Sequence, residues 1–208
     1  MTAADTTRTP RIVLLLDRSG SMASCRENAL VGVNGYLREV ADDPALIGGR
    51  ITLLTFDSGS IDIVRDDVPL AICPPLDATE FVPRGATPLL DAVAKTVSLL
   101  DRYEGRADDP RVLVILTDGY ENASQEHTRA SVSALLRERQ AAGWLVLYLG
   151  ANQDSSAEAQ HLGVEQNAVA DISFEKPGHV ACMLSATTQR FVSLGTRGFS
   201  EDERAKGK

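Results

Sequence analysis

The chain has 208 residues, of which 43% are hydrophobic and 24% charged, and its formal net charge is -8 at pH 7. These values are typical of a globular protein with enough residues for one good-sized core. The acidic balance argues against binding to a nucleic-acid backbone, which requires a basic surface.

The cysteines and the start of the chain indicate the compartment. Cys25, Cys73 and Cys182 are scattered and lack CxxC spacing, which predicts neither a disulfide framework nor a zinc site. The first apolar run, 12–16, is too short for the core of a signal peptide or for a membrane span. We therefore expect a cytoplasmic protein that does not enter a membrane, with a flexible N-terminus at 1–10.

The first half of the chain begins with that apolar run, 12–16, which is typical of a strand buried on both faces. Residues 27–41 carry apolar side chains at spacings of three and four, which predicts an amphipathic helix. Two further strands, 49–58 and 60–67, form a predicted hairpin. A proline-rich connection follows at 68–83.

A helix is predicted next, within residues 87–103. Thr87 matches a helix N-cap and Pro88 matches the first helical position. The elements predicted after it, in chain order, are a strand at 111–119, a helix at 127–143, a strand at 144–152, a short helix at 155–164, a strand at 167–174 and a helix at 177–194.

Strands that alternate with helices, several of the strands being uniformly apolar, predict an α/β fold. Its sheet is expected to be mostly parallel, with helices on both faces. No internal repeat or interdomain linker interrupts the pattern, so we expect a single domain at 11–197. The charged C-terminal tail, 198–208, is expected to fray.

Oxygen-bearing side chains gather where ligands bind in such a sheet, beyond the carboxyl ends of its strands. Asp17 and Asp118 each follow a buried strand, Ser19 and Ser21 come directly after Asp17, and Thr87 follows the loop "PRGAT". Carboxylates and hydroxyls without histidine or thiolate suit a hard cation such as Mg²⁺. We therefore predict a metal site at this edge.

Each of these residues also has an ordinary structural interpretation. Serine and aspartate are favoured N-caps, and Asp-Gly is a common turn dipeptide. One such residue alone is more often a cap than a metal ligand. Three loops that deliver oxygens to the same edge favour the metal site.

Three segments, "DRSGSM", "GATPLLDA" and "ILTDGYEN", resemble the metal-ion-dependent adhesion site (MIDAS) of von Willebrand factor type A (VWA) domains. The DxSxS part matches Asp17, Ser19 and Ser21, the lone threonine matches Thr87, and the aspartate of the "TDG" turn matches Asp118. The resemblance extends over about 11–194. It is strongest to the small intracellular bacterial and phage proteins of this superfamily.

The resemblance implies a Rossmann-like, doubly wound fold with about six strands, one of them a short antiparallel edge strand. It also implies a protein-binding module, with no enzymatic activity, in which Mg²⁺ (or Mn²⁺ or Ca²⁺) bridges to an acidic residue of a partner protein. Cytoplasmic relatives are often associated with AAA+ ATPases, stress-response or phage-conflict systems, and no residue here selects among them.

Enzymatic alternatives fit the sequence less well. A Mg²⁺-dependent phosphatase of the haloacid dehalogenase type would use Asp17 as nucleophile, but needs a second aspartate where the chain has Ser19. The chain also lacks a G-x-x-x-x-G-K-[ST] nucleotide-binding loop and a G-x-S-x-G nucleophile elbow.

Three further residues are expected on the rim of the site and could contact the partner. Arg18, between the proposed ligands, could steer an acidic partner or pair with a nearby carboxylate. Asn152 and Asp154 follow a predicted strand at the same edge. Asp154 could equally cap the helix that starts at Ser155.

Overall fold

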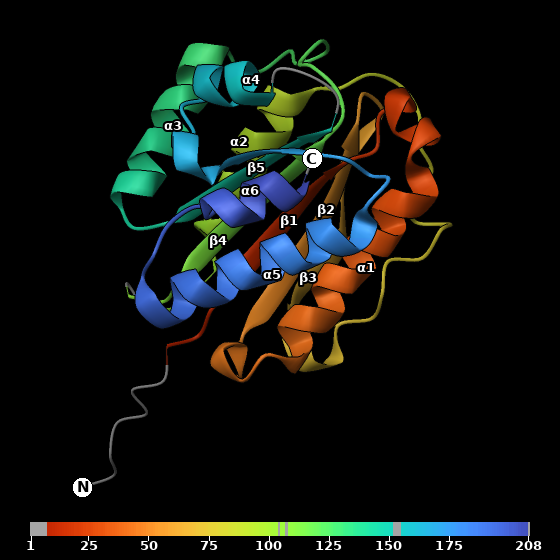
Figure 1. Cartoon of the computed structure of the whole chain (residues 1–208). Helices are drawn as coiled ribbons and strands as arrows, with labels where there is room; N and C mark the ends of the chain where they lie inside the picture. Colours follow the sequence, from red (N-terminus) through yellow and green to blue (C-terminus); the bar gives the residue numbers. More distant parts are fainter. Residues whose placement is uncertain (1–7, 104, 107, 152–154, 208) are drawn as a thin grey trace, which may run out of the picture.

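A computed structural model of the chain describes residues 8–103, 105–106, 108–151 and 155–207. Within these residues the strands form one six-stranded sheet in the order β3-β2-β1-β4-β5-β6 (Figure 1). The strands are β1 (Arg11–Asp17), β2 (Arg50–Asp57), β3 (Ser60–Pro69), β4 (Arg111–Thr117), β5 (Leu145–Ala151) and β6 (Val169–Ile172). The helices are α1 (Arg26–Asp42), α2 (Leu89–Leu100), α3 (Arg129–Ala141), α4 (Ser155–His161), α5 (Pro177–Leu194) and α6 (Glu201–Gly207).

The sheet is parallel except at β3, and β1 lies near its centre. β1 pairs in parallel with β2 on one side and with β4 on the other. Its five consecutive apolar residues are each at most 1% exposed, because helices cover both faces of a central strand. The strand order reverses between β1 and β4, which is where ligands bind in open α/β sheets. The predicted α/β, doubly wound fold is thus confirmed.

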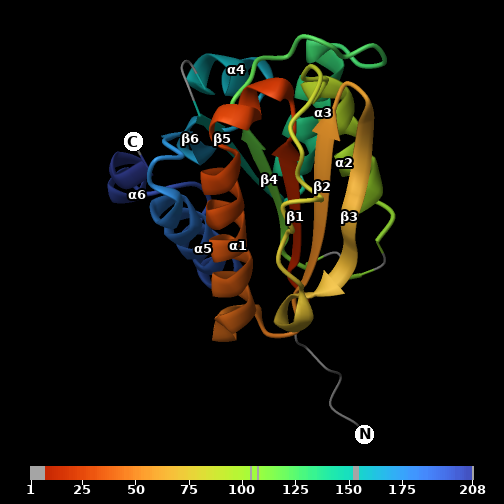
Figure 2. The same cartoon turned by 90° about the vertical axis from the view of Figure 1, so that its right-hand side faces the viewer.

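Helices cover the two faces of the sheet in separate groups. Figure 2 shows α1 and α5 on one face, and α2 and α3 on the other. The α1–α5 contact is close, because a Cβ at Gly35 would lie only 2.8 Å from the Cβ of Ala181. The buried Tyr36 hydroxyl and Thr188 Oγ1, 3.0 Å apart, join the same two helices.

The antiparallel edge strand differs from the expectation of a short one. β3 has 10 residues and is the longest strand in the described part of the chain. Asp57 stabilises the hairpin turn before it, since its Oδ1 accepts hydrogen bonds from the backbone N–H of Gly59 (2.6 Å) and Ser60 (3.1 Å). An aspartate that bonds the backbone two residues later is a common device of tight turns.

The predicted start of the helix within residues 87–103 is also wrong. α2 begins at Leu89, Pro88 takes the N-cap position, and no N-cap side-chain hydrogen bond is formed there. Thr87 therefore does not cap this helix, and its hydroxyl is available for another role.

Described residues near both chain ends contact the rest of the fold. The tail expected to fray contains α6, where Ser200 and Glu203 form reciprocal side-chain to backbone hydrogen bonds. Glu203 also accepts two hydrogen bonds from Arg190 on α5, at 2.6 and 2.8 Å. In the N-terminal segment, the Thr9 N–H donates to Asp109 Oδ1 at 2.8 Å. Among the described helices, none is long and apolar enough to cross a membrane.

Candidate metal site

Asp17 is the last residue of β1, and its side chain points into a buried polar environment. The residue is 0% exposed, and its Oδ1 accepts a 2.7 Å hydrogen bond from the Ser19 N–H. Its Oδ2 accepts a 2.5 Å hydrogen bond from the Thr117 hydroxyl. Burial raises the pKa of Asp17 to about 6, although these two hydrogen bonds act in the opposite direction.

The turn after β1 brings the two serines together and connects them to Asp118. Ser19 Oγ and Ser21 Oγ lie 3.1 Å apart, and the Ser21 hydroxyl donates a 2.6 Å hydrogen bond to Asp118 Oδ1. Burial also raises the pKa of Asp118, and the bond from Ser21 offsets only part of this effect. Two carboxyl groups from neighbouring strands are therefore both held where ionisation is disfavoured.

Thr87 reaches the same place from a third loop. It is 2% exposed, its N–H donates to Asn122 Oδ1 at 2.8 Å, and its carbonyl oxygen accepts from the Asn122 N–H at 3.1 Å. Two reciprocal hydrogen bonds thus join the Thr87 backbone to the loop that follows Asp118.

The convergence of the three loops is seen best at Gly119. A Cβ placed on this glycine would lie 3.0 Å from Thr87 Oγ1, 3.6 Å from Asp17 Oδ2 and 3.6 Å from Ser21 Oγ. Oxygens from the turn after β1 and from the Thr87 loop therefore border a space of about one methyl group at Gly119, which lies on the third loop. Glycine keeps that space open.

This donor set fits a hard divalent cation. The side chains are two carboxylates and three hydroxyls, which suit Mg²⁺, Mn²⁺ or Ca²⁺ better than zinc or copper. The described residues contain no group of three or more His, Cys, Asp or Glu side chains that could hold a metal. Any cation bound at this edge would thus depend on hydroxyl oxygens as well as on Asp17 and Asp118.

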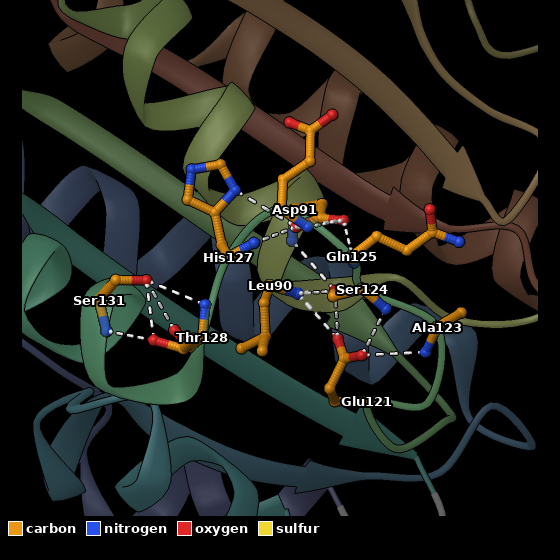
Figure 3. A network of polar contacts seen from close by, with 10 residues as sticks. Leu90, Asp91, Glu121, Ala123, Ser124, Gln125, His127, Thr128 and Ser131 are labelled. Carbon is orange, nitrogen blue, oxygen red and sulfur yellow. Dashed lines mark hydrogen bonds and ion pairs between the residues drawn. The ribbon is translucent and has the colours of Figure 1, made fainter.

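Several residues that were not predicted from the sequence hold these loops in place. Thr117 contacts Asp17 directly, and its only signal is its position before Asp118 in "LTDG". Glu121 and Ser124 accept hydrogen bonds from the Leu90 N–H, at 2.9 and 3.1 Å (Figure 3). The loop after β4 therefore supplies the N-terminal cap of α2 that Thr87 was expected to provide.

Asp91, on α2, also holds the loop after β4 in place, as Figure 3 shows. Its carboxylate accepts hydrogen bonds from the N–H groups of Gln125 (2.7 Å), Glu126 (3.1 Å) and His127 (2.8 Å). Burial alone would raise the pKa of Asp91, but these three N–H groups hold it below its ordinary value.

The predicted rim residues have different outcomes. Arg18 is only 7% exposed, and its guanidinium pairs with Asp57 (2.7 Å) and Asp62 (2.8 Å). Arg18 thus pairs with nearby carboxylates, which is one of the two roles expected for it, and little of its surface faces outward. Asn152 and Asp154 lie outside the described residues.

Comparisons with solved structures identify the fold as that of VWA domains. The vWF domain of the type V pili tip protein Mfa5 from Porphyromonas gingivalis matches with a TM-score of 0.70 and 10% identity, over 95% of this chain and 100% of that one. A von Willebrand factor type A protein from Catenulispora acidiphila matches with a TM-score of 0.61 and 15% identity, over 88% and 43%. Manganese-loaded TRAP protein from Plasmodium vivax matches with a TM-score of 0.58 and 13% identity, over 83% and 72%.

These likenesses concern the fold alone. The chain spans the whole Mfa5 domain but less than half of the Catenulispora protein. No protein-family model matches the chain, and no curated protein matches it in sequence.

Proposed function

We propose that the chain is a metal-dependent protein-binding module. A divalent cation would be held by Asp17, Ser19, Ser21, Thr87 and Asp118, directly or through water, at the MIDAS of a VWA domain. The observation that carries the proposal is the convergence at Gly119, where oxygens of two loops border one small space on the third loop. Caps and turns explain each residue alone but do not require this convergence.

The division of charge among the five side chains supports a bridging role. Two carboxylates carry charge and three hydroxyls carry none, so a bound cation would retain enough positive character to attract a carboxylate from outside. Protein oxygens and water would supply the other positions of its coordination shell. The ligand from outside is therefore proposed to be an acidic side chain of a partner protein.

We propose Mg²⁺ as the cation, with Mn²⁺ or Ca²⁺ as alternatives. The manganese-loaded structure of TRAP, which shares the fold, supports a divalent cation in a domain of this kind. The donor chemistry does not separate these three ions, because all of them prefer oxygen ligands.

The biological setting proposed for the module is a bacterial cytoplasm. There it would act as an adaptor within a larger complex, and a component such as an AAA+ ATPase or a stress or phage-conflict protein would present the acidic residue. The resemblance of the three motif segments to small intracellular VWA proteins supports this setting.

We also propose that the module has no catalytic turnover of its own. A phosphatase acting through Asp17 would need a general acid two residues later, and that position is Ser19. Ser19 Oγ lies 3.1 Å from the Ser21 hydroxyl. A hydroxyl cannot replace a carboxylic acid as proton donor near neutral pH.

Calorimetric titration with MgCl₂ and MnCl₂ tests the metal, and affinity capture from a bacterial lysate tests the partner. Wild type should bind Mg²⁺ or Mn²⁺, and Asp17→Asn should not. Asp202→Asn, which makes the same change at an exposed position on α6, should bind like wild type. Capture should yield proteins that are lost both with EDTA and with Asp17→Asn.

Two results would contradict the proposal. One is the absence of Mg²⁺ and Mn²⁺ binding at millimolar concentration. The other is Mg²⁺-dependent hydrolysis of phosphomonoesters that disappears in Asp17→Asn, which would favour the phosphatase instead.

A further inference from the structure

Arg84 lies directly beside the turn that carries Ser19 and Ser21. Its N–H donates to the Arg18 carbonyl oxygen at 2.9 Å, and the Gly20 N–H donates to the Gly85 carbonyl oxygen at 3.0 Å. Gly85 has φ = +66°, a conformation that favours glycine. These backbone contacts place Arg84 at the edge of the candidate metal site.

Two hydrogen bonds orient the guanidinium of Arg84, and one of its nitrogen atoms is left for a further hydrogen-bond partner. Its Nε donates to Asp57 Oδ2 at 2.9 Å and its Nη2 donates to Ser60 Oγ at 3.0 Å. Asp57 is already paired with Arg18 at 2.7 Å, so two guanidinium groups share this buried carboxylate. The Arg84 side chain is 57% exposed, and in the described part of the chain its Nη1 has no hydrogen-bond partner.

A second cation, Lys95 on α2, contacts the same end of β3 as Arg84. Its Nζ donates to the Ile61 carbonyl oxygen at 2.9 Å, and Ile61 directly follows Ser60, the residue that Arg84 contacts. Lys95 is exposed and has no carboxylate partner among the described residues. Two cations therefore bond consecutive residues at the start of β3.

Lys95 lines a groove of about 520 Å³ between the β2–β3 turn and the loop at 123–127. Arg84 lies beside this groove, since a Cβ at Gly59, which lines it, would lie 3.9 Å from Arg84 Nη2. Asp91 also lines it, but three backbone N–H groups occupy that carboxylate. Asp57, which Arg18 and Arg84 neutralise, and Glu126 are further acids of the lining, so an incoming anion is expected at the Arg84 and Lys95 side.

We infer that this groove receives an acidic segment of the partner protein, and the inference rests on the proposed function. One carboxylate of the segment would lie at the candidate metal site. A second carboxylate, a few residues along the partner chain, would accept hydrogen bonds from Arg84 and Lys95. Arginine suits this role because its planar guanidinium binds a carboxylate through two parallel N–H groups.

Blocked synthetic peptides in saturating Mg²⁺ test the inference. One peptide carries a single aspartate among glycines, and the others add a second aspartate one to four residues later. Binding is measured by NMR titration of wild type, Arg84→Gln, Lys95→Gln and the control Arg38→Gln. Arg38 is exposed on α1, and its side chain makes no hydrogen bond or ion pair in the described part of the chain.

At least one two-aspartate peptide should bind wild type about three- to fivefold more tightly than the single-aspartate peptide, as expected for exposed ion pairs. Arg84→Gln and Lys95→Gln should each reduce this preference, while Mg²⁺ affinity and binding of the single-aspartate peptide stay unchanged. Arg38→Gln should keep the full preference.

The outcomes separate this inference from the proposed function. If the single-aspartate peptide binds in a Mg²⁺-dependent way and a second aspartate does not increase the affinity, only the inference is overturned and the proposed function stands. A preference that survives in both Arg84→Gln and Lys95→Gln would do the same. If no peptide binds the Mg²⁺-loaded protein, the proposed function fails and the inference fails with it.

Discussion

Ser21 donates a 2.6 Å hydrogen bond to Asp118, although 97 positions separate the two residues along the chain. The contact exists because β1 and β4 are parallel neighbours, so that the loops after both strands leave the same edge of the sheet. The proposed metal site therefore depends on the pairing of these strands.

The space beside Gly119 gives the first prediction. Gly119→Ala would place a methyl group 3.0 Å from Thr87 Oγ1, among the oxygens proposed to hold the cation. Mg²⁺ affinity should fall by about tenfold or more, the range found for disturbed metal surroundings. Calorimetric titration measures it, with Gly178→Ala as control, since a Cβ there would meet nothing within 4 Å. Equal Mg²⁺ affinity in the two variants would contradict the proposed position of the cation.

A second prediction separates the site from the scaffold. Val114 is 0% exposed in the core, so Val114→Ala should lower the free energy of unfolding by about 1–3 kcal/mol and leave Mg²⁺ binding intact. Asp118→Ala should change the metal-free stability little and abolish Mg²⁺ binding, because burial already disfavours the charge of Asp118. Urea denaturation with EDTA or MgCl₂ tests the pair. If Asp118→Ala destabilises the metal-free protein as much as Val114→Ala, Asp118 is a structural residue.

A third prediction concerns pH in the absence of metal. Asp17 has an ordinary pKa of 3.8 and a pKa of about 6 in the folded protein. Between these values the folded state binds more protons than the unfolded state, so the contribution of Asp17 to stability falls as pH rises from about 4 to about 6. The loss is on the order of 2–3 kcal/mol.

Urea denaturation in EDTA at several pH values measures this effect as a difference between variants. Wild type should lose stability relative to Asp17→Asn over that pH range, because asparagine does not titrate. The control Asp202→Asn should follow wild type. Parallel pH profiles for wild type and Asp17→Asn would show that burial does not disfavour the Asp17 charge.

A fourth prediction concerns Asp91, whose folded-state pKa lies below its ordinary value. Its stabilising effect should be complete above pH 4 and should disappear as pH falls through the folded-state pKa. Asp91→Ala leaves three N–H groups of the loop unbonded and should cost about 1–2 kcal/mol at pH 7. Urea denaturation at pH 7 and pH 3 checks both statements, and an equal cost at the two pH values would contradict them.

Much of the fold followed from periodicity, since uniformly apolar strands and amphipathic helices alternate along the chain. The predictions that were wrong concern features that depend on long-range contacts. Thr87 and Pro88 carry a local helix-start signal, but Glu121 and Ser124 cap α2 from another loop and Thr87 bonds Asn122 instead. No local pattern contains that information.

The candidate site was predictable to a different degree. The five candidate ligands could be predicted because each loop carries its ligands in a short local motif. They are Asp17, Ser19, Ser21, Thr87 and Asp118. The pairing of Arg18 with Asp57 and Asp62 could not be read in the same way. It depends on how closely the β2–β3 hairpin approaches the turn after β1.

The long edge strand β3 has a consequence for self-association. An exposed strand edge can pair with the edge of another molecule and lead to aggregation. Here Lys95 donates to the Ile61 carbonyl oxygen, and Arg65 donates to that of Val64. Arg65 also binds Glu80 and the Pro75 carbonyl oxygen, which ties the segment after β3 to the strand. Side chains thus occupy carbonyl groups that another strand would need, and copies of this protein should not add to one another through β3.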